Sequence, residues 1–192
     1  MPGLVEVLGA LAQACSSLSL RWYLFGAQAA IAYGSARLSA DVDATVELGA
    51  RPVAALVGAM REAGFSLRVS DAEDFAERAR VLPFVHDASS MPVDIVLAGP
   101  GLEELFLERA QFQVVGGASI PTACAEDIVA MKILAGRAKD IEDVVAILAA
   151  RRGELNLELV RDTLKLLEGA LGQSDLLPAL EAALARSGRQ GA

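Results

Sequence analysis

Apolar positions recur along the chain with two periods, which predict its first helices and strands. Residues 4–15, LVEVLGALAQAC, and residues 51–65, RPVAALVGAMREAGF, place apolar side chains at helical spacing. The second segment has proline in its first turn and glycine near its end, as helices often do. Residues 20–25, LRWYLF, form an apolar run that ends at Gly26 and predicts a strand. We expect a short helix over residues 27–34 after this glycine.

A second strand carries acidic residues at period two. In residues 41–48, DVDATVEL, the polar positions Asp41, Asp43 and Thr45 alternate with apolar ones. Alternate residues of a β-strand point to the same face. The pattern therefore predicts a strand with one polar, functional face and one apolar face.

The middle of the chain predicts a β-hairpin and two short helices. Residues 80–86, RVLPFVH, and residues 91–99, MPVDIVLAG, read as antiparallel strands joined by the polar turn DASS. Residues 70–73, SDAE, have the pattern of a capping box and predict a helix start. A further helix is expected at residues 101–110 and a strand at residues 112–117.

The remainder of the chain has a helical pattern, broken at residues 151–156, RRGELN, and at residues 172–175, GQSD. The order of elements predicts an α+β fold, in which a mixed β-sheet core is flanked by helices. We assign this core to residues 1–120 and a C-terminal helical region to residues 121–192. Only the tail, residues 186–192, is expected to be disordered.

Composition narrows the possible functions. The formal net charge of -8 argues against a broad nucleic-acid surface, because phosphate binding draws on a surplus of Lys and Arg. Cys15 and Cys124 stand in apolar helical contexts, so we expect buried thiols in a reducing cytoplasm rather than a disulfide. His86, the only histidine, is expected at the surface. No apolar run reaches the roughly 18 residues of a membrane span, and no signal peptide is recognisable, so a cytoplasmic protein without membrane contact is predicted.

Three aspartates are candidate ligands for a hard divalent cation. Asp41 and Asp43 stand about 7 Å apart at their Cα atoms if they lie on a strand. Asp94 lies among apolar residues of the second hairpin strand, where an acid must be ligated, paired or exposed because burying an unpaired charge is costly. If this strand lies beside the strand of Asp41, three carboxylates meet at one site. Mg²⁺ takes such oxygen ligands and keeps waters and substrate phosphates in its shell.

A glycine turn precedes the acid pair. Gly26 ends a predicted strand and a helix follows near Gln28, so backbone amides can approach a phosphate group there. The other glycine, in Gly34-Ser35, leaves only five residues before Asp41, too few for a helix and a return to the sheet. We therefore take Gly26 as the phosphate-loop glycine and Gly34-Ser35 as a helix C-cap.

This arrangement resembles the nucleotidyltransferase superfamily, the fold of DNA polymerase β and the aminoglycoside nucleotidyltransferases. The family pattern is an apolar residue, Gly, then Gly or Ser, followed after nine to thirteen residues by acid, apolar, acid. The matching residues are Phe25, Gly26 and Ala27, then thirteen residues, then Asp41, Val42 and Asp43. The chain has Gly26-Ala27-Gln28 where the family usually has Gly-Ser or Gly-Gly, so the serine hydroxyl is missing.

The resemblance is closest to the branch of abortive-infection and type IV toxin-like nucleotidyltransferases. Arg37 precedes the acid pair by a few residues, as in that branch. Residues 130–148, AMKILAGRAKDIEDVVAIL, resemble the branch's helical motif of lysine, arginine and lysine-aspartate. The residues carried over are Lys132, Arg137, Lys139, Asp140 and Asp143.

The geometry of this segment leaves two alternatives. In the first alternative, a continuous helix places Lys132, Lys139 and Asp143 within about 40° of one another around its axis. In the second, the helix breaks near Gly136, a weak helix former, and Arg137 can then join these residues. The same residues could also form an ordinary exposed helix face with an i,i+4 pair between Lys139 and Asp143.

The resemblance implies an enzyme that uses Mg²⁺ or Mn²⁺ and transfers a nucleoside monophosphate from a nucleoside triphosphate to an acceptor hydroxyl. Asp41, Asp43 and Asp94 would be the catalytic and metal-ligating residues. The implied nucleotide-binding residues are Gly26, Ala27, Gln28, Arg37, Lys132, Arg137, Lys139, Asp140 and Asp143.

The acceptor stays open at this point: the 3′ end of tRNA, with a cognate antitoxin as partner, a small molecule or a protein. The missing loop serine favours an alternative, a catalytically silent nucleotide-binding or regulatory protein of the same fold. A purely structural interaction protein is the third alternative, although it would not need three acids around a glycine turn.

Overall fold

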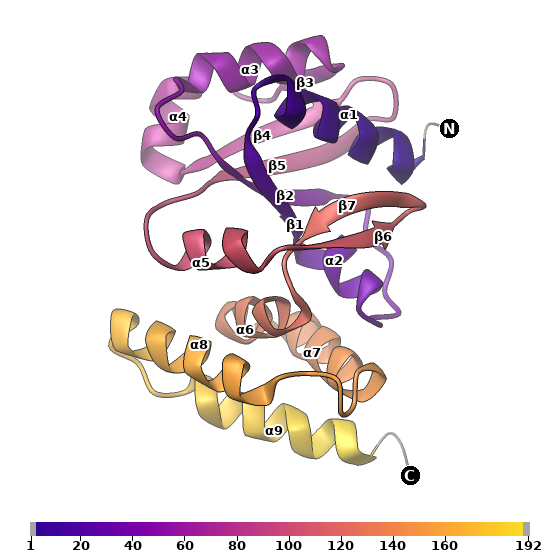
Figure 1. Cartoon of the computed structure of the whole chain (residues 1–192), viewed down its shortest axis with the longest axis vertical. Coiled ribbons are helices and arrows are strands. Elements are labelled where there is room, and N and C mark those ends of the chain that lie inside the picture. Colours follow the sequence, from indigo (N-terminus) through magenta and orange to yellow (C-terminus); the bar gives the residue numbers. More distant parts are fainter. Residues whose placement is uncertain (1–2, 190–192) are drawn as a thin grey trace. The chain divides into compact units, whose positions relative to one another are not determined.

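The computed structural model describes residues 3–189 (Figure 1), which form two compact units. The first unit comprises Met1–Gln28 and Ser39–Ala123, and the second comprises Ala29–Leu38 and Cys124–Ala192. None of the helices in the described part of the chain is long and apolar enough to cross a membrane.

The first unit contains the β-sheet. Its elements are α1 (Leu4–Ser17), β1 (Arg21–Phe25), the start of α2 (Gly26–Ala32), β2 (Val42–Glu47), α3 (Val53–Glu62), β3 (Phe65–Leu67), α4 (Ala72–Ala79), β4 (Val81–His86), β5 (Met91–Leu97), α5 (Leu102–Arg109), β6 (Gln111–Val115) and β7 (Ala118–Thr122). Within residues 3–189 the sheet has seven strands in the order β3-β4-β5-β2-β1-β7-β6. Strand β2 pairs antiparallel with β1 and parallel with β5, so the sheet is mixed and the predicted α+β fold is confirmed.

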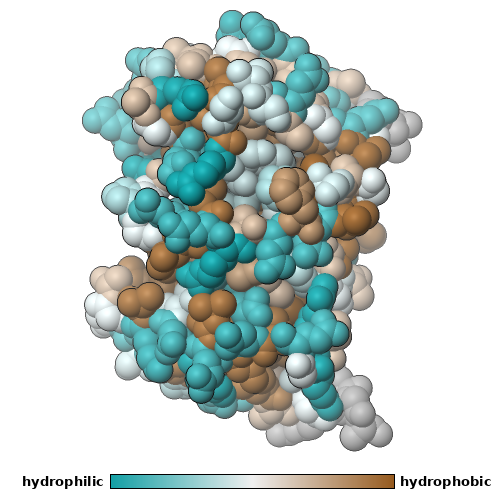
Figure 2. All heavy atoms as spheres, viewed as in Figure 1, coloured by the Kyte–Doolittle hydropathy of each residue, from teal (hydrophilic) through white to brown (hydrophobic). Residues whose placement is uncertain are grey.

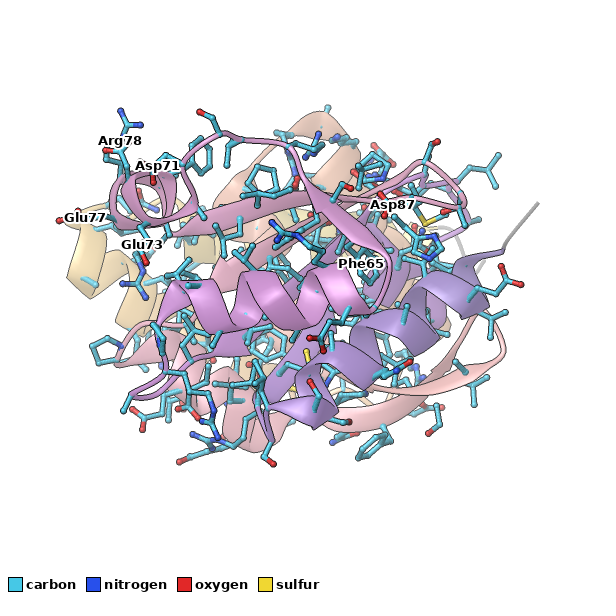
Figure 3. All side chains as sticks on the ribbon, turned by 90° about the horizontal axis from the view of Figure 1, so that it is seen from above. Phe65, Asp71, Glu73, Glu77, Arg78 and Asp87 are labelled. Atoms are coloured by element: carbon cyan, nitrogen blue, oxygen red, sulfur yellow. The ribbon has the colours of Figure 1, made fainter. Side chains whose placement is uncertain are left out.

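The two faces of the sheet differ in how they are covered. Helices α1, α3 and α4 lie over one face and α5 over the other (Figure 1), and α1 and α3 lie side by side in the view from above (Figure 3). On the face that α1, α3 and α4 cover, Val42, Ala44 and Val46 are completely buried. On the opposite face Asp43 and Asp94 remain partly exposed. The period-two pattern of β2 therefore separates core side chains from accessible acids, as the sequence predicts.

The hairpin of β4 and β5 is confirmed, with Pro83 opposite Asp94. Two strands were not expected: β3, which has only three residues, and β7, whose Pro121 weakens a strand pattern. Strand β7 follows Gly116 and Gly117, which both have positive φ, the geometry of a tight two-residue hairpin turn. The glycine pair therefore marks a hairpin turn between β6 and β7, where the sequence analysis placed the end of the strands.

The burial of His86, Cys15 and Cys124 can be compared with the prediction from the sequence. His86 is buried rather than at the surface, because it packs on Phe65 and shares a hydrogen bond of 2.8 Å with the Ser89 hydroxyl. Cys15 and Cys124 are buried free thiols, as predicted. Burial raises the pKa of Cys15 to about 12, so this thiol stays protonated and unreactive near neutral pH.

The second unit is helical. It contains α6 (Ala125–Ala135), α7 (Ala138–Ala150), α8 (Leu157–Leu171) and α9 (Leu176–Arg189). The gaps before α8 and α9 fall at the predicted breaks. Gly136 takes a left-handed conformation with φ of 63° and ends α6, and Arg137 precedes α7 as its N-cap. The helix therefore breaks at Gly136, and the alternative of one continuous helix is wrong.

The predicted disordered tail is wrong in its first part, since α9 continues through residue 189. Arg186 pairs with Glu142 at 2.5 Å, and the carbonyl of Ser187 accepts a hydrogen bond of 2.9 Å from Arg152. These contacts within the second unit anchor the helix. Residues 190–192 lie outside the described residues.

Apolar side chains at the surface are dispersed. On the face shown in Figure 2 they form separate patches between hydrophilic ones. Among the described aromatic residues only Phe112, on the edge strand β6, is largely exposed, at 73 %. The described surface thus offers no row of aromatic side chains for stacking bases.

Candidate active site

Three aspartates lie on or beside the neighbouring strands β2 and β5 of the first unit. Asp41 immediately precedes β2, and Asp43 is the second residue of that strand. Strand β5 lies beside β2, with Asp94 directly opposite Asp43. Neighbouring strands are about 4.8 Å apart, and opposite residues point to the same face. The condition under which the sequence predicted three neighbouring carboxylates is therefore met.

Asp41 and Asp94 each have a local partner. Asp94 Oδ1 lies 2.7 Å from Nη2 of Arg68, and Asp41 Oδ1 accepts a hydrogen bond from the Ser39 hydroxyl. Within residues 3–189 no three His, Cys, Asp or Glu side chains converge closely enough to form a complete metal-ligand set. Convergence of all three acids on one cation would therefore require Asp94 to share its carboxylate between that cation and Arg68.

Gly26 lies directly against the carboxylate of Asp43. A Cβ atom on Gly26 would stand 2.1 Å from Oδ2 and 2.8 Å from Cγ of Asp43. The φ of Gly26 is +68°, in the left-handed region that favours glycine. Glycine is thus required here for two reasons, its backbone conformation and the space that the aspartate occupies. The sequence pattern indicates a phosphate loop at Gly26, but it does not reveal this contact with Asp43.

Gln28 holds the segment that leads into β2. Its side chain is buried, and Nε2 donates hydrogen bonds to the carbonyls of Ser39 at 3.1 Å and Asp41 at 3.2 Å. Both donors of the amide are therefore directed at the backbone that carries the first acid of the pair. Ala27 beside it is buried as well, at 6 % exposure. The geometry gives Gln28 a positioning role for Asp41.

Removing the amide in Gln28→Ala is expected to lower the free energy of unfolding by about 1–3 kcal/mol, because two buried carbonyls lose their donor. Urea unfolding of the variant measures this loss. The matched control is Gln13→Ala, since Gln13 is exposed on α1 and alanine is a better helix former. Equal unfolding free energies for the two variants would contradict the positioning role.

The residues of the C-terminal motif belong to the second unit, where they form a buried network. Lys132 Nζ lies 2.7 Å from Asp143 Oδ2 and 3.2 Å from Asp140 Oδ1. Lys132 is 6 % exposed and both aspartates are 2 % exposed. The alternative of an exposed helix face is therefore wrong for these three residues. Lys139 is exposed on α7.

Asp143 also binds the segment that follows α2. The Ser35 hydroxyl donates to Oδ1 of Asp143 at 2.6 Å, and Arg37 Nη1 donates to Oδ2 at 3.1 Å. Ser35 is buried, although it was expected to act only as a helix C-cap. No sequence signal reveals this contact, because its partners are 108 residues apart.

Asp140 is the second acid of this network, and Arg137 donates a hydrogen bond to it through Nε. Burial acts to raise the pKa of Asp140, but the hydrogen bond from Arg137 and the charge of Lys132 outweigh it and lower the pKa below its ordinary value. The charged form of Asp140 is thus the one that the folded second unit favours.

This shift predicts a pH dependence. Because the folded pKa of Asp140 lies below the unfolded value near 3.8, its stabilisation is complete above that value and is lost as pH falls through the folded pKa. Asp140→Asn should lower the unfolding free energy by about 3 kcal/mol at neutral pH, and the difference from wild type should shrink below about pH 4. Urea unfolding between pH 3 and pH 7 measures both.

The control for this experiment is Asp162→Asn, which removes an exposed ion pair with Lys165. It should cost less than about 1 kcal/mol at every pH. A pH-independent difference between wild type and Asp140→Asn would contradict the coupling of Asp140 to Arg137 and Lys132.

No protein-family model matches the sequence, and comparison with curated proteins finds no match. Solved structures do share the fold. The antibiotic-resistance factor ANT(2'')-Ia in solution superposes with a TM-score of 0.60 at 16 % identity, over 88 % of this chain and 92 % of that chain. Its complex with adenylyl-2''-tobramycin gives a TM-score of 0.60 at 16 % identity, over 87 % of this chain and 98 % of that chain.

A third structure also shares the fold. An antigenic nucleotidyltransferase-like protein from Paracoccidioides brasiliensis gives a TM-score of 0.55 at 17 % identity, over 92 % of this chain and 91 % of that chain. These matches extend over nearly the whole length of each protein. The chain therefore has the nucleotidyltransferase fold, as the resemblance in its sequence predicts.

Proposed function

We propose that this protein is a metal-dependent nucleotidyltransferase. The observation that carries the proposal is the register of β2 and β5, which sets Asp94 directly opposite Asp43, two residues after Asp41. Carboxylates at neighbouring positions of a half-exposed sheet face repel one another because they carry like charges. A shared cation removes that repulsion.

The donor set suits Mg²⁺ or Mn²⁺. Both cations prefer carboxylate oxygens and keep part of their shell for water and phosphate, and Gly26 makes room for the Asp43 carboxylate. Asp41 and Asp43 would hold the cation, and Asp94 would join them through the oxygen that Arg68 does not engage. When bound, the metal would stabilise the charge of the triphosphate and of the attacking and leaving oxygens.

In the proposed reaction an acceptor hydroxyl oxygen attacks the α-phosphorus of a nucleoside triphosphate. The bond from that phosphorus to the bridging oxygen breaks, and pyrophosphate leaves. Asp94 would accept the hydroxyl proton, since it lies beside the acid pair and is half-exposed. Gln28 and Ser39 would keep Asp41 in place, through the backbone and the side chain respectively.

The other residues implied in nucleotide binding differ in how free they are to reach a ligand. The Gly26-Ala27 turn would present its backbone to the phosphates. Lys132 is occupied by two carboxylates within the second unit, so we assign it a structural role. Arg37 and Arg137 keep 28 % and 64 % of their side chains exposed and are better suited to bind an anion. Lys139, exposed on α7, is a further candidate.

We propose a small molecule as acceptor. The net charge of -8 and the lack of exposed aromatic residues in the described chain other than Phe112 argue against RNA. The tRNA end and the antitoxin partner implied by the toxin-like branch are therefore the weaker option. The complex of ANT(2'')-Ia with adenylyl-2''-tobramycin provides a precedent on the same fold, and an acidic protein suits a cationic acceptor.

The test is to incubate the purified protein with Mg²⁺, each α-³²P nucleoside triphosphate and one acceptor class at a time. The classes are cationic amino sugars, total tRNA and the protein itself. We expect label transfer to a small molecule with matching pyrophosphate release, and its loss on chelation of the metal. Metal-dependent nucleotide binding without any transfer would favour the silent binding protein, and absence of both would favour a structural protein.

A further inference from the structure

Arg68 reaches the acid site from a neighbouring part of the sheet. It follows β3, and its backbone N–H donates to the carbonyl of Pro83 on β4 at 2.8 Å. Its side chain extends across β4 to β5, where Nη2 lies 2.7 Å from Oδ1 of Asp94. Backbone and side chain are thus both fixed within the first unit. Both side chains of the ion pair are 42 % exposed, so the pair is open to a ligand.

The position of Asp94 makes this contact specific. Asp94 is opposite Pro83 on β4 and opposite Asp43 on β2. The side chain of Pro83 has no polar atom, so this opposite residue supplies no donor to the carboxylate. Arg68 supplies that donor from one strand further away. A carboxylate has two oxygens with about four lone-pair sites, so the bond at Oδ1 leaves the other oxygen for a second partner.

We propose that Arg68 is a positioning residue for Asp94 in nucleotidyl transfer; this inference rests on the proposed function. Carboxylates that bind a metal are commonly oriented by a hydrogen bond from outside the site. The guanidinium orients Asp94 toward Asp43 and at the same time offsets one of three neighbouring negative charges. It therefore opposes cation binding while it favours turnover.

An arginine that positions Asp94 weakens cation binding and raises turnover. This combination distinguishes it from an arginine with another role. An ion pair that only stabilised the fold would change neither metal affinity nor turnover in the folded protein. An arginine that bound the triphosphate would mainly raise the KM for nucleotide when removed. An arginine that positions Asp94 lowers kcat when removed, with little change in that KM.

The experiment compares Arg68→Gln and Arg68→Lys with wild type. The control is Arg78→Gln, which removes an exposed pair with Asp74 on α4 in the same unit. Figure 3 labels Arg78 together with Glu73 and Glu77 of the same helix. Mn²⁺ affinity is measured by electron paramagnetic resonance without nucleotide, kcat and KM by label transfer, and folding by thermal unfolding.

We expect Arg68→Gln to bind Mn²⁺ at least as tightly as wild type and to lower kcat by about 10–100-fold. The KM for nucleotide should change by less than about threefold. Arg68→Lys should recover part of kcat, because it keeps the charge but not the planar geometry. Arg78→Gln should match wild type in all three measurements.

Unchanged kcat in Arg68→Gln would overturn the inference and leave the proposed function intact. So would a large rise in KM at constant kcat, which would make Arg68 a phosphate-binding residue. A wild-type protein that binds no Mn²⁺, or that transfers no nucleotide, would overturn the proposed function itself and this inference with it.

Discussion

Asp43→Asn should reduce nucleotidyl transfer by about a thousandfold or more, the rate equivalent of about 4 kcal/mol of transition-state stabilisation. Asparagine has nearly the same shape but no charge, so the variant removes a metal ligand with little change in packing. Asp43 is the central acid of the three, since it lies two residues from Asp41 on β2 and opposite Asp94 on β5. Losing its charge therefore weakens the whole cation site.

The measurements are initial rates of label transfer at saturating nucleotide, Mn²⁺ binding, and thermal unfolding. The matched control is Glu47→Gln, which makes the same change of charge on the same face of the same strand. Glu47 forms an exposed pair with Arg21 at 2.7 Å, so its loss should leave the rate within about twofold of wild type. Similar rates for Asp43→Asn and Glu47→Gln would show that the acid face is not the reaction centre.

The pattern of the sequence was sufficient for the parts of the site that depend on local geometry. Period two places Asp41 and Asp43 on one strand face, and a lone acid in an apolar strand identifies Asp94 as a residue that needs a partner. The order of strands was not predictable. That β5 lies beside β2 in parallel, with Asp94 opposite Asp43, is a property of the sheet topology.

The residues that hold the acids were missed for the same reason. Arg68 is 26 residues from Asp94 and Ser35 is 108 residues from Asp143, and an arginine in a loop or a serine after a glycine is common in any sequence. Gln28 was identified, but as a nucleotide-binding residue. Its two hydrogen bonds to backbone carbonyls before β2 give it the role of positioning Asp41. Contacts between distant segments need the fold before they can be recognised.

The structural role of the C-terminal motif follows from the burial of its charged side chains. On a surface helix Lys132, Asp140 and Asp143 would contribute a few tenths of a kcal/mol. All three are buried instead, and removal of one member of a buried charge network is far more costly than removal of an exposed one. The second unit thus uses this motif to hold residues 35–37, and a sequence pattern cannot distinguish that use from nucleotide binding.

Gly26→Ala is the second substitution with a large expected effect, because it acts on Asp43 without altering any charge. The added methyl group would lie 2.1 Å from Asp43 Oδ2, so the carboxylate must move away from its place beside the turn. Alanine at a φ of +68° adds about 1–2 kcal/mol of backbone strain. We expect Mn²⁺ affinity and label transfer to fall by about a hundredfold, and the Tm to fall by about 2–8 °C.

The control is Gly58→Ala in α3, where an added Cβ would meet nothing within 4 Å and φ is not positive. It should raise stability by up to about 1 kcal/mol, since alanine is the better helix former, and leave transfer unchanged. The comparison separates an effect on cation binding from an effect on the stability of the fold. If Gly26→Ala lost stability but bound Mn²⁺ as tightly as Gly58→Ala, the Asp43 carboxylate would have to bind the cation from a second position, and its close contact with Gly26 would serve folding alone.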